Sequence, residues 1–310
     1  MNLLVGDIGG THTRLAVYAR SGFAGVAVLQ NDSSPDFYTL LTGYCARLPA
    51  TLRPQRARFA VAAPVTTQSV RLTNRDWHLD SEQLREILGL QSVQLINDFA
   101  ALVLGIHQLE PGGFRQIGGG YADPRAALVA IGPGTGFGMA GLVPCEDHWA
   151  VVSSEGGHAT LATLNGRELE ILGRMRHKDD PVSVEEVLSG PGLLNLYKAI
   201  AALDGITVEA QTQEAVTQLA RNGNQLALET LDMFFRFLGR TAGDAALAFN
   251  ARGGAYLAGG ILPELRPELE RSRFRDAFEN KGKYTDYVVA IPTFLITDPL
   301  VALRGLASMP

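Results

Sequence analysis

The stretch Leu95-Ile96-Asn97-Asp98-Phe99 decides the predicted fold. Its apolar start is typical of the end of a buried strand, and residues 100–104 are typical of the first turns of a helix. We therefore expect Asn97 and Asp98 at the carboxyl end of a strand. Ligands collect there in α/β proteins, because strand ends and helix starts direct amides and side chains into one crevice. Taken alone, however, the pair is more simply explained as a helix N-cap.

The composition is that of an ordinary globular protein, with 46% hydrophobic and 19% charged residues in a chain of 310. That length allows two domains sharing a cleft, or one large domain. A net charge of -5 without a Lys/Arg-rich run argues against a nucleic-acid-binding surface. Cys45 and Cys145 have neither metal-site spacing nor a secretory signal beside them, so we expect reduced thiols in a cytoplasmic protein. No apolar stretch reaches the roughly 18 to 20 residues that a membrane span requires, which predicts no membrane partner.

A glycine-rich hairpin is predicted at the start of the chain, where a strand at residues 3–5 and a strand at 14–18 flank Gly6-Asp7-Ile8-Gly9-Gly10-Thr11-His12-Thr13. Such a turn lets backbone amides approach an anion, and the hydroxyls of Thr11 and Thr13 could add donors. Asp7 would repel a bare phosphate unless Mg²⁺, directly or through its water shell, lies between them. The alternative is a plain β-hairpin whose glycines serve only the turn.

The same pattern returns in the middle of the chain. A strand over residues 126–131 is followed by Gly132-Pro133-Gly134-Thr135-Gly136-Phe137-Gly138 and a second strand over 139–143. Two such hairpins suggest a duplicated domain with a nucleotide between the copies. Neither GxGxxG nor GxxxxGK[ST] occurs, so neither a Rossmann dinucleotide site nor a Walker P-loop is supported.

Two acidic segments follow. Glu155 and His158 flank a Gly-Gly pair, which favours a loop that presents polar groups over a core position. Ser183 and Glu186 have the spacing of a capping box, so Glu186 has a structural role and Glu185 is left for another.

The rest of the chain is predicted to be mainly helical. Gly190-Pro191-Gly192 should break a helix, and the apolar helix over residues 226–238 should be buried or form an interface, which makes a homodimer plausible. A third glycine turn at Ala258-Gly259-Gly260-Ile261 would let a flat ring lie against the backbone. We expect a strand over 288–291 and a last helix over 299–306 that packs back on the first domain.

Six motifs, in this order, resemble those of the bacterial glucokinases in the hexokinase and actin-like ATPase superfamily. They are Gly6-Asp7-Ile8-Gly9-Gly10-Thr11, Leu95-Ile96-Asn97-Asp98-Phe99, Gly132 to Gly138, Glu155-Gly156-Gly157-His158, Val187-Leu188-Ser189-Gly190-Pro191-Gly192 and Ala258-Gly259-Gly260-Ile261. The resemblance covers nearly the whole chain, and the Cys-rich zinc motif of the repressor/kinase branch is lacking.

The resemblance implies an α/β, two-domain actin-like ATPase fold of the ribonuclease H-like type, in which sugar and ATP meet in an interdomain cleft. Residues 1–105 plus 297–310 would form a small α/β domain, and residues 106–296 a large one. The implied activity is ATP-dependent, Mg²⁺-assisted phosphorylation of D-glucose to glucose 6-phosphate.

The resemblance also implies a role for each matching residue. Asp98 would be the base toward the 6-hydroxyl, and Asp7 would hold Mg²⁺ through water. The sugar ligands would be Asn97, Asp98, Glu155, His158 and Glu185. The phosphate loops would be Gly9-Gly10-Thr11 and Gly134-Thr135-Gly136, and Gly259 and Gly260 would lie at the adenosine.

The residues support this chemistry independently. Phosphoryl transfer requires alignment, charge neutralisation and one carboxylate to orient the attacking hydroxyl, which the glycine loops and Asp98 could provide. Relatives commonly have Asn where this chain has His12, and Pro133 stands inside the second loop, so the phosphate contacts are open at both. A kinase for another hexose, a different phosphoryl donor, and a catalytically silent sugar-sensing regulator are the alternatives. The regulator is disfavoured by the strand expected at Leu3, which leaves no room for an N-terminal DNA-binding domain.

Overall fold

The computed structural model describes residues 2–72, 75–110 and 112–309. The chain divides into two compact α/β units, the first formed by Met1–Pro111 with Asp298–Pro310 and the second by Gly112–Thr297. The predicted domain boundaries lie a few residues from these divisions, and the assignment of the two units as domains stays a prediction.

The first unit is built on a mixed sheet with the strand order β3-β2-β1-β4-β7. Its strands are β1 (Leu3–Ile8), β2 (His12–Ala19), β3 (Gly22–Gln30), β4 (Arg56–Val61) and β7 (Ser92–Asn97). β1, β2 and β3 pair antiparallel, whereas β1, β4 and β7 run parallel. A separate hairpin consists of β5 (Ser69–Arg71) and β6 (His78–Asp80).

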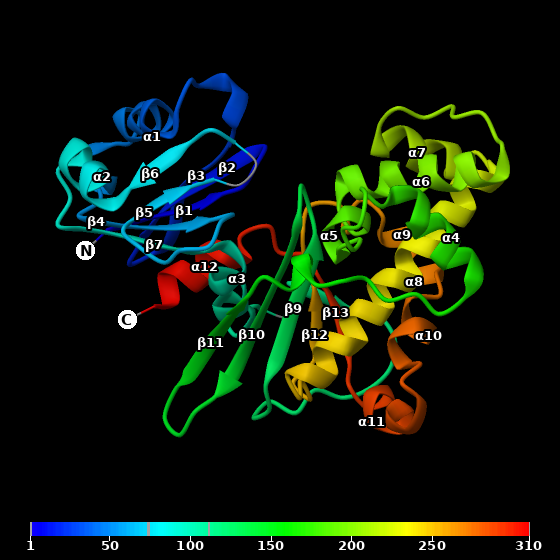
Figure 1. Ribbon diagram of the computed structural model, residues 1–310. Helices are drawn as coiled ribbons and strands as arrows, with labels where there is room; N and C mark the ends of the chain where they lie inside the picture. Colours follow the sequence, from blue (N-terminus) through cyan, green and yellow to red (C-terminus); the bar gives the residue numbers. More distant parts are fainter. Residues whose placement is uncertain (1, 73–74, 111, 310) are drawn as a thin grey trace. The chain divides into compact units, whose positions relative to one another are not determined.

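Helices cover both faces of this sheet. They are α1 (Phe37–Ala46), α2 (Ser81–Leu88), α3 (Asp98–Ile106) and α12 (Val301–Ser308), with short 3-10 turns η1 (Asn31–Ser33) and η2 (Ala50–Leu52). As predicted, the last helix packs back on the first unit, where α12 lies beside α3 (Figure 1). The approach is so close that a Cβ at Gly305 would stand 1.8 Å from the carbonyl oxygen of Ala101, which explains the glycine.

The second unit contains a sheet with the order β11-β10-β9-β12-β13-β8. Its strands are β8 (Phe114–Gln116), β9 (Leu128–Pro133), β10 (Phe137–Pro144), β11 (Trp149–Ser154), β12 (Ala255–Leu257) and β13 (Thr293–Ile296). β9, β10 and β11 pair antiparallel, and β9, β12 and β13 run parallel, so the first sheet's pattern is repeated with β8 added at one edge. This repeated strand pattern agrees with the predicted duplication, and a nucleotide between the two copies stays a prediction.

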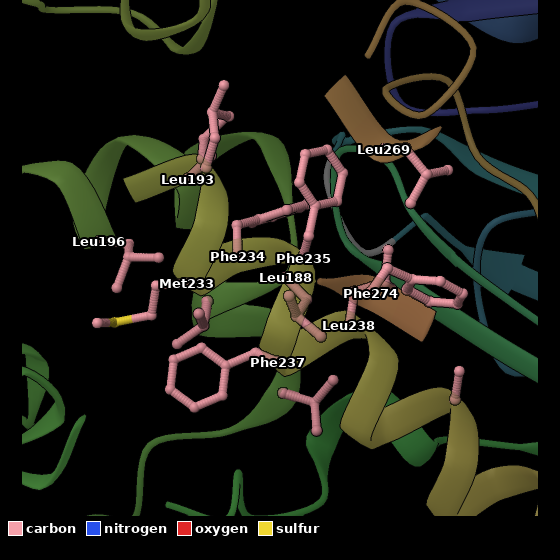
Figure 2. Close-up of a cluster of buried hydrophobic side chains, with 14 of the residues drawn as sticks. Leu188, Leu193, Leu196, Met233, Phe234, Phe235, Phe237, Leu238, Leu269 and Phe274 are labelled. Atoms are coloured by element: carbon pink, nitrogen blue, oxygen red, sulfur yellow. The ribbon is translucent and has the colours of Figure 1, made fainter. Parts of the chain in front are cut away.

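The hydrophobic core of the second unit surrounds one long helix, α8 (Gln225–Ala248). The other helical segments are α4 (Gly166–Met175), α5 (Val184–Val187), α6 (Gly190–Asp204), α7 (Gln213–Arg221), α9 (Arg266–Arg271), α10 (Phe274–Glu279), α11 (Thr285–Val289), η3 (Gly156–His158) and η4 (Gly282–Tyr284). Figure 2 shows Phe234, Phe235 and Phe237 of α8 among leucines from neighbouring helices. Burial of each such side chain contributes about 1.5–3 kcal/mol. These aromatic side chains are buried within the unit, so they offer no surface for the homodimer that the sequence suggested.

Two local predictions are wrong. α5 and α6 are separate helices, as expected, but Gly190-Pro191-Gly192 does not lie between them. It forms the first turn of α6, because Ser189 caps the helix and proline is tolerated in a first turn, where its missing N–H has no partner in the helix. Residues 288–291 do not form a strand, since α11 extends to Val289 and the sheet strand begins at Thr293. Among the described residues, no helix has the length and apolar character needed to cross a membrane.

Candidate active site

Asp7 lies near the carboxyl end of β1, directly opposite Arg14 of β2. The Arg14 Nη1 atom is 3.3 Å from Asp7 Oδ2. Burial raises the pKa of Asp7 above its ordinary value, and the neighbouring guanidinium opposes that shift. Asp7 is thus a carboxyl group paired with Arg14, two residues before the first glycine loop.

The first loop, Gly9-Gly10-Thr11, is a tight turn in which the Gly9 amide donates to the His12 carbonyl at 3.0 Å. Thr11 and His12 are exposed at its tip. The hydroxyl of Thr13, a suggested anion donor, is instead buried and donates to Asn31 Oδ1 at 2.8 Å. That suggestion is wrong for Thr13, because the alternation of β2 turns its side chain into the unit.

Asn31 is a functional candidate that the sequence reasoning missed. It is fully buried, and its Nδ2 donates to the carbonyls of Gly9 at 2.8 Å and Gly10 at 3.1 Å. The signal in the sequence was weak, because Asn31 is simply a polar residue after a strand. It lies 22 positions from Gly9 and 21 positions from Gly10 along the chain.

Asn97 and Asp98 occupy the predicted junction of β7 and α3. Asn97 is the N-cap of α3, with Oδ1 accepting from the Ala100 amide at 3.1 Å and Nδ2 donating to the Ala63 carbonyl at 3.4 Å. The capping interpretation therefore holds for Asn97. Asp98 starts the helix, is half-buried, and accepts from the Phe99 amide at 2.9 Å.

The strand register brings these groups to one edge of the first sheet. Ile8 pairs with Val61, and Val61 pairs with Asn97, so the three parallel strands end level with each other. The first glycine loop follows β1, and Asp98 follows β7. Both candidate groups thus lie at the carboxyl edge of the same sheet, where α/β folds bind ligands.

The second loop, Gly134-Thr135-Gly136, joins β9 to β10 in the second unit. The Gly134 amide donates to the Gly136 carbonyl at 2.7 Å, and the Gly134 carbonyl accepts from the Gly190 amide at 2.9 Å. Thr135 is exposed at the tip. The loop is therefore tied to the start of α6 by its own backbone.

Glu185 lies directly beside the second loop. The predicted capping box of α5 is confirmed, because Ser183 and Glu186 make both of its hydrogen bonds. Glu185 is consequently not needed by the helix, and its Oε2 accepts from the Phe137 amide at 2.7 Å. A Cβ on Gly136 would stand 2.3 Å from the same oxygen, so the glycine leaves room for the carboxylate in this position.

Glu155 is the N-cap of the η3 turn and His158 is its last residue, and both are exposed. Between them, Gly157 is buried against β10, where a Cβ would stand 2.4 Å from the Phe137 carbonyl oxygen. The Ala159 carbonyl accepts from the Val184 amide at 2.9 Å, which joins this turn to α5. The structure thus brings the Glu155–His158 turn, Glu185 and the second loop together within the second unit.

Gly259 and Gly260 follow β12 in a turn that packs on the end of β9. Gly259 has a φ of +91°, and a Cβ there would stand 2.2 Å from the Pro133 carbonyl oxygen. Nothing lies within 4 Å of a Cβ at Gly260. Gly259 therefore has a packing reason to be glycine, whereas Gly260 leaves open space beside the backbone.

The residues present fit a magnesium ion that is bound by one protein carboxylate together with phosphate oxygens. Among the described residues, no group of three or more His, Cys, Asp or Glu side chains could hold a metal ion by itself. Mg²⁺ is commonly bound by one or two carboxylates together with phosphate oxygens and water. Asp7, beside the first glycine loop, meets that requirement.

Comparison with known proteins identifies the family. The family model described as Glucokinase matches residues 4–310. The curated glucokinase of Paramagnetospirillum magneticum is 38% identical, over 99% of this chain and 97% of the relative. A crystal structure of glucokinase from an Antarctic psychrotroph superposes with a TM-score of 0.85 at 35% identity, covering 99% of this chain and 97% of that chain.

More distant sugar kinases share the fold. A glucokinase of the ROK family from Streptomyces griseus, solved with glucose and AMPPNP, has a TM-score of 0.67 at 18% identity, over 99% of this chain and 98% of that chain. Structures of this kind have the actin-like ATPase fold, and the repeated sheet described above agrees with it. The chain belongs to the glucokinase family.

Proposed function

We propose that this chain transfers the γ-phosphoryl group of ATP to the 6-hydroxyl of D-glucose, with Asp98 as the base. The observation that carries the proposal is the shared carboxyl edge of β1 and β7, which places the first glycine loop and Asp98 at one side of a single sheet. Membership of the glucokinase family supports the reaction. The shared carboxyl edge of the sheet supports the roles proposed for the first glycine loop and Asp98.

Asp98 would accept the proton of the 6-hydroxyl as that oxygen attacks the γ-phosphorus. A bond then forms between the sugar oxygen and phosphorus, the bond from phosphorus to the bridging oxygen breaks, and ADP leaves. A carboxylate at the start of a helix is favoured electrostatically, because the helix N-terminus carries partial positive charge. General-base assistance of this kind contributes about 10²–10⁴-fold to the rate.

The remaining site residues would bind and orient the two substrates. Asn97, Glu155, His158 and Glu185 would hydrogen-bond the sugar hydroxyls, and an epimer that leaves such groups unpaired would be rejected. The amides of Gly9-Gly10-Thr11 and Gly134-Thr135-Gly136 would bind phosphates, and Gly259 and Gly260 would lie at the adenosine. When bound, Mg²⁺ would neutralise phosphate charge, and Asp7 would hold it through water.

This proposal requires the sugar ligands of the two units to meet around one glucose, with the units as domains that close over it. Closure would exclude water from the γ-phosphate. Small-angle scattering with and without saturating glucose tests it, and an unchanged profile would count against closure. A cytoplasmic location and a homodimer stay separate proposals, the second tested by light scattering.

The experiment that tests the function is ADP release from Mg·ATP with glucose, mannose, fructose, galactose and N-acetylated amino sugars. We expect glucose to drive turnover far above the others. The Asp98→Ala variant should keep its fold by circular dichroism and lose about 10²–10⁴-fold in kcat. Activity within tenfold of the unmodified protein would remove Asp98 as the base. Binding of a sugar without turnover would favour the silent regulator.

A further inference from the structure

One buried residue, Asn31, binds three consecutive carbonyls of the first glycine loop, two with its side chain and one with its backbone amide. Asn31 donates from Nδ2 to the Gly9 and Gly10 oxygens at 2.8 and 3.1 Å, and from its backbone amide to the Thr11 oxygen at 2.9 Å. Its own Oδ1 accepts from the Thr13 hydroxyl. Asn31 is fully buried and therefore has a fixed orientation.

The direction of the loop amides follows from these bonds. In a trans peptide the C=O and the N–H point in opposite directions across the plane. Since the carbonyls of Gly9 and Gly10 are directed at Asn31, the amides of Gly10 and Thr11 are directed away from it. Successive amides that face the same way make a concave site for an anion.

Arg75 adds a fixed positive charge to the same loop. Its Nε donates to the Gly10 oxygen at 3.3 Å, and its guanidinium forms an ion pair with Asp32. The guanidinium carbon also lies 4.8 Å from the ring centre of Trp77, which is itself buried. Its contacts with Gly10, Asp32 and Trp77 restrict the side chain of Arg75. Arg75 therefore acts on the loop backbone and does not move to bind an anion directly.

We propose that Asn31 and Arg75 are positioning residues for the polyphosphate of the nucleotide. They hold the loop carbonyls away from the bound phosphates, so that amides rather than carbonyl oxygens face the negative charge, and Arg75 lowers the cost of bringing that charge to the loop. The inference rests on the proposed function, because it takes the first loop as a phosphate loop.

The chain offers a matched control in the β5–β6 hairpin region. Arg71 also pairs with a carboxylate, that of Asp76, but its side chain is 72% exposed, whereas that of Arg75 is 21% exposed. Arg75→Met and Arg71→Met remove the same charge from neighbouring positions. Only the first removes a hydrogen bond to the glycine loop.

The test is calorimetric binding of Mg·AMPPNP, adenosine and glucose to the full chain. For Arg75→Met we expect the Kd of Mg·AMPPNP to rise about tenfold, because the phosphates lose a nearby positive charge and the loop loses a bond that orients its amides. The Kd values of adenosine, which has no phosphate, and of glucose should stay within twofold. Arg71→Met should change none of the three.

Several outcomes would overturn the inference. If Arg75→Met binds Mg·AMPPNP with a Kd within twofold of the unmodified protein, Arg75 has no positioning role. If Arg75→Met weakens adenosine binding as much as Mg·AMPPNP binding, the effect does not act on the phosphates. Arg75→Lys should recover only part of the loss, since lysine keeps the charge but not the stacked planar fork; full recovery would show a charge effect without positioning. If the unmodified protein binds neither nucleotide nor adenosine, the proposed function fails first.

Asn31→Asp keeps the shape of the side chain and replaces both Nδ2–H donors with an oxygen. We expect a lower unfolding midpoint in urea, because this oxygen would face two carbonyls. We also expect Mg·AMPPNP to give less stabilisation against urea than it gives to the unmodified protein. Equal stabilisation would contradict the role of Asn31, and the Arg75 variants keep the test decisive should this variant not fold.

Discussion

In the first glycine loop, Gly9-Gly10-Thr11, side-chain N–H groups bind the backbone carbonyls, whereas beside the second, Gly134-Thr135-Gly136, a carboxylate binds a backbone amide. Asn31 and Arg75 provide the donors in the first case, and Glu185 provides the acceptor in the second. The hairpins have the same topology, since each joins antiparallel strands next to a parallel one. Two hairpins with similar glycine patterns are therefore held by different hydrogen-bonding groups.

The difference teaches that a glycine-rich hairpin does not by itself define an anion site. In the first loop, the bound carbonyls leave amides directed outward. Beside the second loop, a phosphate would meet the negative charge of Glu185 unless that charge is balanced by other groups. In the proposed function, the second loop would bind phosphate while Glu185 and the Glu155–His158 turn beside it would bind the sugar.

The largest expected effect tests the backbone packing beneath the second loop. Gly259→Ala would add a Cβ 2.2 Å from the Pro133 oxygen at a φ of +91°. The positive φ costs about 1–2 kcal/mol, and the overpacking costs a further 1–3 kcal/mol, roughly. Urea unfolding should therefore show a loss of stability of about 2–5 kcal/mol.

The neighbouring glycine is the control for that substitution. A Cβ at Gly260 has nothing within 4 Å, so Gly260→Ala should change stability by less than about 0.5 kcal/mol. Equal stability losses in the two variants would show that the second loop does not rest on the Gly259 contact.

How far the sequence predicts this molecule depends on the range of the interactions. Asn97 at the end of β7, the capping box of α5 and both glycine hairpins were predictable, because each is specified within a few residues. Arg75 was not, since its bond to Gly10 spans 65 residues and only the folded chain brings the two together. The strand expected at 288–291 failed because Val288 and Ile291 are buried while Val289 is 41% exposed, a spacing of three that suits a helical turn rather than an alternating strand.

The second prediction separates the observed bond of Glu185 to the Phe137 amide from its proposed contact with the sugar. Glu185→Gln retains an oxygen that can accept from the Phe137 amide, so stability should stay within about 0.5 kcal/mol. Loss of the charge should weaken a sugar hydrogen bond and lower kcat/KM for glucose about tenfold. Steady-state kinetics and thermal unfolding measure the two effects.

Removing the side chain altogether should affect both properties. In Glu185→Ala, the Phe137 amide loses its acceptor and the sugar loses a ligand, so we expect about a 100-fold lower kcat/KM together with a stability loss of about 1 kcal/mol. If kcat/KM for glucose is unchanged in both variants, Glu185 has a purely structural role. The two loops would then differ in their hydrogen bonds without a difference in substrate binding.

The third prediction concerns the tip of the second loop. A Cβ at Gly134 meets nothing within 4 Å, so Gly134→Ala should fold normally. The methyl group would nevertheless cover backbone that a phosphate must approach, and we expect the KM for ATP to rise several-fold, by roughly 1 kcal/mol of binding. The KM for glucose is the control and should not change. Unaltered ATP kinetics would mean that phosphate binding belongs to the first loop alone.

The smallest effect is a pH shift at the first loop. Burial raises the pKa of Asp7, and Arg14 at 3.3 Å limits that rise. Because the ionised form is the one that would hold Mg²⁺, the acid limb of kcat/KM for Mg·ATP should lie higher than an ordinary aspartate would place it. Arg14→Gln removes the opposing charge, raises the pKa further and should move the acid limb to still higher pH.

The sign of the stability change gives an independent reading of the same group. A raised pKa means that the folded state favours protonated Asp7, so its contribution to stability is present at low pH and is lost as pH rises through the folded pKa. Arg14→Gln should therefore destabilise the protein more at neutral pH than in acid. In acid Asp7 is protonated, so the substitution removes no ion pair there. Arg14→Lys keeps the charge and serves as the control for both readings. An acid limb and a pH–stability profile that do not move in Arg14→Gln would show that Asp7 does not titrate as a partner of Arg14, and the first loop would then depend on Asn31 and Arg75 alone for its electrostatics.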